Sequence, residues 1–135
     1  MLHVVAGVIV RENRILCCRK GHTNHEETSY KFEFPGGKIK HGESPEIALK
    51  RELLEELGIE INLIKSLESQ IYSYPNLTVC IEFYLCEISQ YEPIATEHIE
   101  LIWCTQENIQ SLEWLAADLP LVDRIHTKGI ESLFS

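Results

Sequence analysis

The sequence predicts a single α+β domain, and three observations support this prediction. The chain has 135 residues, which suits one domain with a substantial core. Runs rich in β-branched residues alternate with segments that carry helix start and stop signals. No linker, internal repeat or low-complexity segment interrupts this alternation. We therefore expect one domain over residues 1–135.

The first part of the chain favours strands. Residues 3–10 (HVVAGVIV) and 15–19 (ILCCR) are β-rich and flank the polar RENR, which indicates a hairpin. The polar residues 20–30 are expected to form a loop. Residues 31–37 (KFEFPGG) are expected to form a short strand that enters a glycine turn.

A helix is expected between Ser44 and Gly58. Ser44 suits the N-cap, Pro45 suits the first helical position, and glycine is typical of the residue that ends a helix. A projection at about 100° per residue separates an apolar half from an acidic half. The apolar half is Ile47, Leu49, Leu53, Leu54 and Leu57, and the other half is Ala48, Arg51, Glu52, Glu55 and Glu56.

Three further apolar runs and two helices complete the predicted order. Residues 61–67 and 78–88 are joined through a Tyr-Pro-Asn turn, and residues 99–104 form the third run. A polar helix is expected from Gln106, and a final helix after Pro120.

Composition limits the classes of function. The net charge of −9 argues against binding of a nucleic-acid polymer, which needs clustered Lys and Arg, but allows an anionic substrate if a metal ion intervenes. The apolar run at residues 4–10 is too short for a membrane span and lacks the basic flank of a secretion signal. The five cysteines form no CxxC pair, so we expect reduced core thiols of a cytoplasmic protein.

The acidic half of the helix is the first candidate site. Glu52, Glu55 and Glu56 lie within about one and a half turns, where like charges repel one another. Mg²⁺ binds through such carboxylates together with substrate phosphates. Arg51 can neutralise a carboxylate that the metal leaves free. The alternative interpretation is a solvated helix face with i,i+4 ion pairs, and the helix alone leaves both open.

The segment from residue 37 to residue 59 resembles the Nudix box, GX5EX7REUXEEXGU, at every fixed position. The charged and glycine positions are Gly37, Glu43, Arg51, Glu52, Glu55, Glu56 and Gly58. The flanking FEFPGGKI is similar to MutT-type nucleoside triphosphate pyrophosphohydrolases. So are TEHIELIWC and ADLPL, which are most similar to CTP pyrophosphohydrolases.

The resemblance implies the Nudix fold, a mixed curved sheet sandwiched between helices (α/β/α), and a metal site. Mg²⁺, or Mn²⁺ as a substitute, is expected on Glu52, Glu55, Glu56, the carbonyl oxygen of Gly36, and Glu97. The expected catalytic residues are Arg51, Glu52, Glu55 and Glu56. Glu52 or a neighbour would serve as the base for the attacking water, whereas Glu43 and Arg51 would brace the loop and the helix. A side chain at Gly36 would block close approach of metal and phosphate.

The resemblance also implies substrate contacts. Lys38 follows the glycine pair and is placed to reach phosphate, and Lys20 matches a basic phosphate-binding position where arginine is usual. Glu33 and Phe34 precede the glycine pair; the Phe34 ring could contact a base or pack in the core. His98 simply follows Glu97, and no role is expected for it.

Asp118 is the fifth expected substrate contact. It stands where the MutT oxidised-guanine hydrolase carries an asparagine. An ionised aspartate only accepts hydrogen bonds, so it opposes the O6 acceptor of 8-oxoguanine and suits the exocyclic amine of cytosine. A protonated aspartate, or another pose of guanine, would weaken this exclusion. The alternative is that Asp118 only caps the last helix.

The function expected from the resemblance is hydrolysis of nucleoside triphosphates to monophosphate and pyrophosphate, with cytidine or modified pyrimidine nucleotides preferred. The alternative substrates are 8-oxo-dGTP and ADP-ribose or a dinucleotide. A regulatory Nudix module that binds nucleotides without hydrolysis is the alternative outside the enzymes, and the intact box argues against it. We expect a monomer or a homodimer that binds neither nucleic-acid polymer nor membrane.

Overall fold

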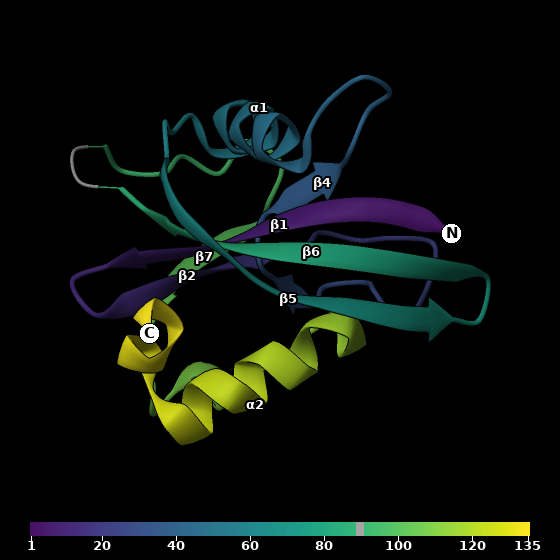
Figure 1. Cartoon of the computed structure of the whole chain (residues 1–135). Coiled ribbons are helices and arrows are strands. Elements are labelled where there is room, and N and C mark those ends of the chain that lie inside the picture. Colours follow the sequence, from purple (N-terminus) through teal and green to yellow (C-terminus); the bar gives the residue numbers. More distant parts are fainter. Residues whose placement is uncertain (89–90) are drawn as a thin grey trace.

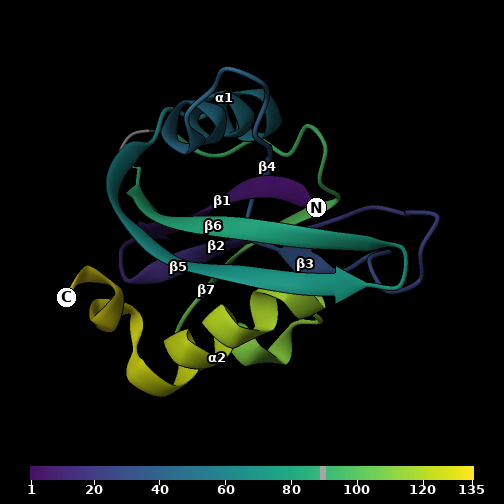
Figure 2. The same ribbon diagram turned by 45° about the vertical axis from the view of Figure 1, so that its right-hand side comes forward.

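The computed structural model describes residues 1–88 and 91–135, and helices cover both faces of a mixed β-sheet (Figure 1). Helix α1 (Pro45–Leu57) covers one face, and α2 (Leu119–Lys128) covers the other. The view in Figure 2 shows the same three layers. This arrangement confirms the predicted α/β/α sandwich.

Seven strands form the sheet, in the order β3-β2-β1-β6-β5, with β4 paired to β1 and β7 paired to β2. Strands β1 and β6 are parallel, and the other pairs are antiparallel. The bounds are β1 Leu2–Arg11, β2 Arg14–Arg19, β3 Phe32–Glu33, β4 Gly36–Lys38, β5 Asn62–Tyr74, β6 Leu77–Glu87 and β7 Glu100–Cys104. The expected hairpins between β1 and β2 and between β5 and β6 are confirmed.

The glycine pair lies in a strand, so the expected glycine turn is wrong. Gly36 pairs with Ala6 of β1, and a Cβ atom at Gly36 would overlap the carbonyl oxygen of Val5. Pro35 separates β3 from β4, because proline cannot donate to a ladder. Close approach of β1 is therefore sufficient to require glycine at this position.

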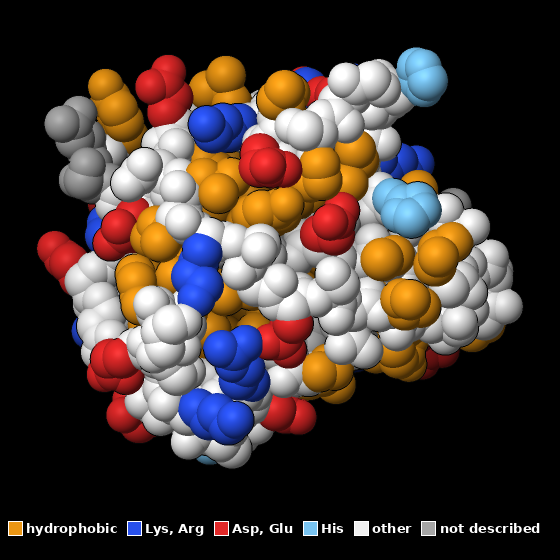
Figure 3. All heavy atoms as spheres, in the orientation of Figure 1, with side chains coloured by type: hydrophobic (Ala, Val, Ile, Leu, Met, Phe, Trp, Pro, Cys, Tyr) orange, Lys and Arg blue, Asp and Glu red, His pale blue; other side chains and the backbone are white. Residues whose placement is uncertain are grey.

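Helix α1 has the predicted bounds. The Ser44 hydroxyl accepts a hydrogen bond from the Ile47 N–H at 3.2 Å, and Gly58 ends the helix with φ of 66°. The predicted faces are partly wrong. Ile47 and Leu54 are 59% and 54% exposed, and apolar side chains reach the surface around α1 in Figure 3. The helix rests on the sheet along one narrower stripe, which is Ala48, Leu49, Leu53, Glu56 and Leu57.

The C-terminal part differs from the prediction. The polar helix expected from Gln106 is wrong, since this region holds only the 3₁₀ turn η1 (Ile109–Ser111). The Asn108 side chain accepts a hydrogen bond from the Thr105 N–H at 2.8 Å and holds a turn in place of a helix. The final helix begins one residue before Pro120. The 3₁₀ segments η2 (Ala116–Asp118) and η3 (Ile130–Phe134) flank it.

The sheet separates two apolar cores, one under α1 and one under α2. All five cysteines are free, and four of them are buried, as expected of core thiols. None of the helices in residues 1–88 and 91–135 has the length and apolar character needed to cross a bilayer.

Candidate active site

All five predicted substrate residues line a cavity of about 260 Å³. We call one part of its surroundings the α1 end, formed by β4 and the acidic helix face with Arg51, Glu52, Glu55 and Glu56. We call the other part the η2 end, formed by Tyr74, Ala117 and Asp118. The lining residues include Lys20, Glu33, Phe34, Gly36, Gly37, Lys38, Glu56, Tyr74, Ala117 and Asp118.

Arg51 joins the loop before α1 to the helix. Its Nε and Nη2 atoms donate to the two carboxylate oxygens of Glu43 at 2.6 and 2.9 Å. Nη2 also donates to the Lys38 carbonyl oxygen at 3.1 Å. The hydrogen bonds from Arg51 lower the pKa of Glu43 to about 2. Such a bidentate pair fixes the loop that precedes the acidic face, as expected for a brace.

The same arginine also contacts two of the helix acids. Its Nη1 lies 3.0 Å from Glu52 Oε1 and 3.4 Å from Glu55 Oε2. The Glu52 carboxyl packs against Gly37, because a Cβ atom at Gly37 would overlap it. Glu55 is mostly exposed. Arg51 therefore orients Glu52 toward β4, and Gly37 provides the space for it.

Glu56 is the helix acid with which Arg51 forms no ion pair among the described residues, although the charge of Lys20 partly lowers its pKa. It is 7% exposed, and burial, followed by the charges of Glu33, Glu52 and Glu97, raises its pKa to about 8. Its Oε2 atom is buried and has no hydrogen-bond partner among the described residues. A buried carboxyl oxygen that lacks a partner is costly unless it is protonated or meets a cation.

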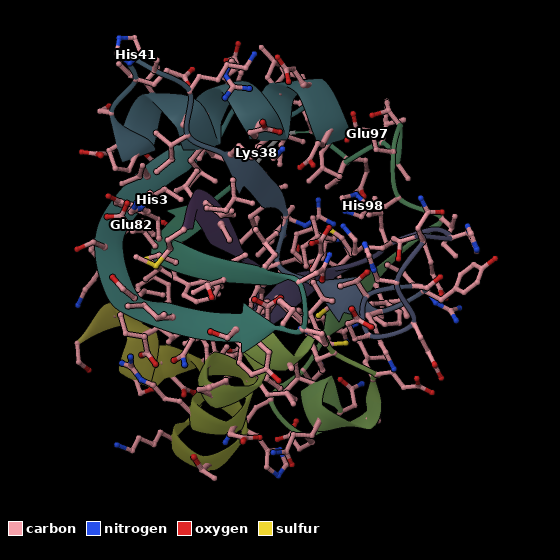
Figure 4. All side chains as sticks on the ribbon, turned by 90° about the vertical axis from the view of Figure 1, so that its right-hand side faces the viewer. His3, Lys38, His41, Glu82, Glu97 and His98 are labelled. Atoms are coloured by element: carbon pink, nitrogen blue, oxygen red, sulfur yellow. The ribbon has the colours of Figure 1, made fainter. Side chains whose placement is uncertain are left out.

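The predicted metal ligands are not gathered in one cluster. Among residues 1–88 and 91–135, no group of three or more His, Cys, Asp and Glu side chains is arranged to hold a metal ion. Glu97 is exposed on the segment before β7, across from Lys38 in Figure 4. Thr96, beside it, donates from its hydroxyl to the Glu56 carbonyl oxygen at 2.7 Å, which ties this segment to the end of α1. The donor set nevertheless fits a hard cation, because its oxygens include the orphaned Glu56 Oε2.

His98 is a buried polar residue that the sequence did not indicate, and it contacts the predicted substrate residue Glu33, which lines the cavity. His98 Nε2 lies 2.9 Å from Glu33 Oε2, and His98 is 8% exposed. Lys20 Nζ lies 3.8 Å from the other Glu33 oxygen. No local pattern reveals this group, because 65 residues separate His98 from Glu33.

Asp118 faces the cavity at the η2 end and is 3% exposed. Its Oδ2 accepts a hydrogen bond from the Phe34 N–H at 3.3 Å. The side chain makes no capping hydrogen bond to α2, so the capping alternative is wrong. Burial, and then the charge of Glu33, raises the pKa of Asp118 well above its usual range. The preceding residue, Ala117, donates from its N–H to the Tyr74 hydroxyl at 3.2 Å.

The other predicted substrate residues lie around the same cavity. Phe34 is 2% exposed, and its ring packs 4.7 Å from Trp114 and 5.9 Å from Phe83 between ring centroids. Packing is therefore the observed role of its ring, and its N–H positions Asp118. Lys20 and Lys38 are the cationic residues of the lining.

The chain is similar in sequence and in structure to proteins of one known family. The NUDIX domain model matches residues 1–125. The 8-oxo-dGTP diphosphatase of Escherichia coli is 32% identical over 125 residues, which cover 92% of this chain and 95% of that protein. The CTP pyrophosphohydrolase of Escherichia coli is 31% identical over 123 residues, covering 91% and 90%. The crystal structure of the MutT protein of Methanosarcina mazei superposes with a TM-score of 0.78 at 25% identity, covering 94% and 96%.

Proposed function

This chain belongs to the Nudix family, and we propose that it hydrolyses nucleoside triphosphates to monophosphate and pyrophosphate, with cytidine nucleotides preferred. The broader statement, that it is a MutT-like hydrolase of nucleotides, follows from the family and its relatives. We further propose the cleavage to monophosphate and pyrophosphate, the preference for a cytosine base and a cytoplasmic location.

The observation that carries the proposal is the pair of unlike ends around one cavity. Phosphates and base lie at opposite ends of a nucleotide, with the sugar between them. The α1 end offers oxygen ligands together with Lys38, and the η2 end offers a single buried carboxyl group. A nucleoside triphosphate fits this arrangement. Its charged phosphates would lie at the charged α1 end, and its uncharged base would lie at the buried η2 end.

Glu52, Glu55, Glu56, the Gly36 carbonyl oxygen and Glu97 would hold the divalent cation, which we propose is Mg²⁺ with Mn²⁺ as a substitute. When bound, the cation would neutralise phosphate oxygens and lower the pKa of a water molecule. Lys38 and Lys20 supply further positive charge toward the phosphates.

Glu52 is the proposed base for the attacking water. The Arg51 guanidinium holds its carboxylate at 3.0 Å, and the same guanidinium is held by Glu43. This arrangement fixes the direction of the carboxylate before the substrate arrives. Arg51 and Glu43 therefore act by positioning, and Glu52 accepts the proton.

The proposed preference for cytidine rests on Asp118. Burial raises the pKa of Asp118 and thereby favours the neutral acid over the ionised form on which the expectation from sequence was based. Cytosine suits both forms. The carboxylate accepts from the exocyclic amine, and the neutral acid can also donate to N3. In the pose that presents O6 and N7–H, 8-oxoguanine suits only the neutral form, which donates to O6 and accepts from N7–H.

Sanitation of 8-oxo-dGTP is the second candidate, and two observations favour it. The raised pKa of Asp118 makes the donor form available. Relatives from Escherichia coli and Haemophilus influenzae that are 32% identical are 8-oxo-dGTP diphosphatases.

The test compares kcat/KM for CTP, 5-methyl-dCTP and 8-oxo-dGTP in the wild type and in Asp118→Asn. We expect the wild type to prefer the cytidine nucleotides, and the variant to shift the ratio toward 8-oxo-dGTP by roughly tenfold. Asp123→Asn, at an exposed position of α2, is the matched control and should leave the ratio unchanged.

The panel also includes ADP-ribose and a dinucleotide, and four outcomes would contradict the proposal. An unchanged ratio in Asp118→Asn would place this residue outside base recognition. A wild-type preference for 8-oxo-dGTP would replace cytidine by the second candidate. Preferred turnover of ADP-ribose or a dinucleotide in the same panel, or tight nucleotide binding without turnover, would remove the triphosphatase assignment itself.

A further inference from the structure

We propose that His98 is a positioning residue, which holds the Glu33 carboxylate between the α1 end and the η2 end so that it can contact the nucleotide there. The proposal rests on the nucleotide hydrolysis proposed above. The sequence alone predicts no role for His98, whereas its burial and its hydrogen bond to Glu33 indicate one.

The imidazole of His98 has a single polar partner in the described part of the chain. Its side chain is 4% exposed, and Nε2 lies 2.9 Å from Glu33 Oε2. Nε2 donates in this bond when Glu33 is ionised, because a carboxylate oxygen can only accept. The other ring nitrogen, Nδ1, is buried without a partner among the described residues. A position that served packing alone would be filled at lower cost by an apolar side chain.

The Glu33 carboxylate depends on this contact. Its other neighbour is Lys20 Nζ at 3.8 Å, which is beyond hydrogen-bonding distance. Strand β3, which carries Glu33, pairs with β2, and this pairing holds the backbone of Glu33 without fixing its side-chain torsion angles. The hydrogen bond from His98 is therefore the interaction that selects the orientation of the carboxylate.

The position of Glu33 affects both ends of the cavity. Its charge is the largest charge contribution that raises the pKa of Glu56, and the same holds for Asp118. The carboxylate consequently lies close to both groups. In the proposed orientation of the substrate, this region receives the part of the nucleotide between phosphates and base.

The backbone around His98 explains how a loop residue can position another side chain. The Thr96 N–H donates to the Glu56 carbonyl oxygen at 3.3 Å, and the Ile99 N–H donates to the Arg19 carbonyl oxygen at 3.0 Å. These bonds anchor the segment to the end of α1 and to the end of β2, on both sides of His98. In Figure 4, His98 and Glu97 follow one another on this segment before β7.

The test uses His98→Phe, which keeps ring volume without a donor, and His98→Gln, which places an amide donor at a similar reach. Steady-state KM and kcat for the preferred triphosphate are measured with the midpoint of thermal unfolding. We expect KM to rise roughly tenfold in His98→Phe, with a smaller change in kcat and little loss of thermal stability. His98→Gln should recover most of the wild-type KM. His41→Phe, in the exposed loop before α1, is the matched control.

A double-mutant cycle with Glu33→Gln shows whether His98 acts through Glu33. We expect His98→Phe to raise KM by less than twofold in the Glu33→Gln background, because the carboxylate is then absent. Independent, multiplying effects of the two substitutions would overturn the proposal, and so would a wild-type KM in His98→Phe. A wild-type protein that turns over no nucleotide would instead overturn the proposed function.

Discussion

The two ends of the cavity both depend on carboxyl groups, but they control the charge of those groups differently. At the α1 end one guanidinium contacts Glu43, Glu52 and Glu55, whereas Glu56 is buried and its Oε2 has no hydrogen-bond partner among the described residues. At the η2 end Asp118 accepts one hydrogen bond from a backbone N–H, and no cationic side chain forms a hydrogen bond with it among the described residues. The first end has an excess of acids, and the second end has one isolated acid.

This difference shows how surroundings decide what a carboxyl group does. Arg51 keeps the pKa of Glu43 at about 2, whereas burial and neighbouring acids raise the pKa of Glu56 to about 8. Burial is also the first cause of the raised pKa of Asp118, and in the proposed complex a base satisfies this group by hydrogen bonding. The α1 end is thus suited to cations and phosphate, and the η2 end to hydrogen bonding with a base.

Removal of divalent cations tests the α1 end most severely. With excess EDTA we expect complete loss of turnover, restored by Mg²⁺ or Mn²⁺, because the acids of this end repel phosphate when they are not neutralised. Activity with metal should rise toward alkaline pH. The measurement is pyrophosphate release from the triphosphate. Turnover that persists in EDTA would show that the α1 end works without a cation.

Removal of single carboxylates at the α1 end should have the next largest effect. Glu52→Gln and Glu56→Gln are each expected to lower kcat by roughly 10²–10⁴-fold, because a base or a metal ligand is lost. Glu60→Gln removes the same charge at an exposed position just beyond α1 and should be close to wild type. Near-normal kcat in both Glu52→Gln and Glu56→Gln would support the alternative of a solvated helix face.

The pH dependence of base preference tests the η2 end. Since the pKa of Asp118 is raised, the neutral form persists above its usual range and is lost as pH rises through the raised value. In the pose that presents O6 and N7–H, recognition of 8-oxo-dGTP requires the neutral form, so its kcat/KM relative to that of CTP should fall severalfold with rising pH. Ionisation of the attacking water would change kcat/KM for both substrates by the same factor, so its effect cancels in the ratio.

The charged and ionisable groups near Asp118 include Glu33, Lys20 and Tyr74. Asp118→Asn separates their contributions, because an amide does not ionise in this range. A flat ratio in the variant and a falling ratio in the wild type are expected. Equal slopes in both proteins would show that another group sets the preference.

The smallest expected effect is on stability of the metal-free protein. The pKa of Glu56 is raised from 4.5 to about 8, so the folded state holds its proton more tightly than the unfolded state. The contribution of Glu56 to the free energy of unfolding therefore falls as pH rises from about 4.5 to about 8. Glu56→Gln should match the wild type near pH 4.5 and exceed its unfolding midpoint by a few degrees near pH 9.

Thermal unfolding in EDTA at several pH values measures this difference. Glu60→Gln is again the control, and its difference from wild type should not grow with pH. A Glu56→Gln protein that is less stable than wild type at pH 9 would mean that the ionised side chain is compensated in the folded state.

Local signals account for the features that were predicted correctly. The bounds of α1 follow from Ser44, Pro45 and Gly58, which act on the backbone within one turn. The hairpin between β1 and β2 follows from two β-rich runs around a short polar turn, in which Glu12 and Asn13 have φ of 51° and 59°. The acidic face follows from helical spacing. These features need no knowledge of distant residues.

Features that depend on distant partners were missed or misjudged. The glycine pair was expected in a turn, but the approach of β1 places it in a strand. His98 received no role because its partner is 65 residues away. Ile47 was placed on the buried face, yet the sheet contacts a narrower stripe of α1 than the projection suggests.

Local signals in the sequence are enough to predict the order of most elements, the bounds of α1 and the family, because caps, turn residues and spacing act over a few residues. The partners of each carboxyl group depend instead on contacts between distant parts of the chain. Asp118 meets the Phe34 N–H across 84 residues, and Glu33 meets His98 through the pairing of β2 with β3 and β7. Burial and partners from distant strands set the pKa of a side chain, and neither can be read from its neighbours in the chain.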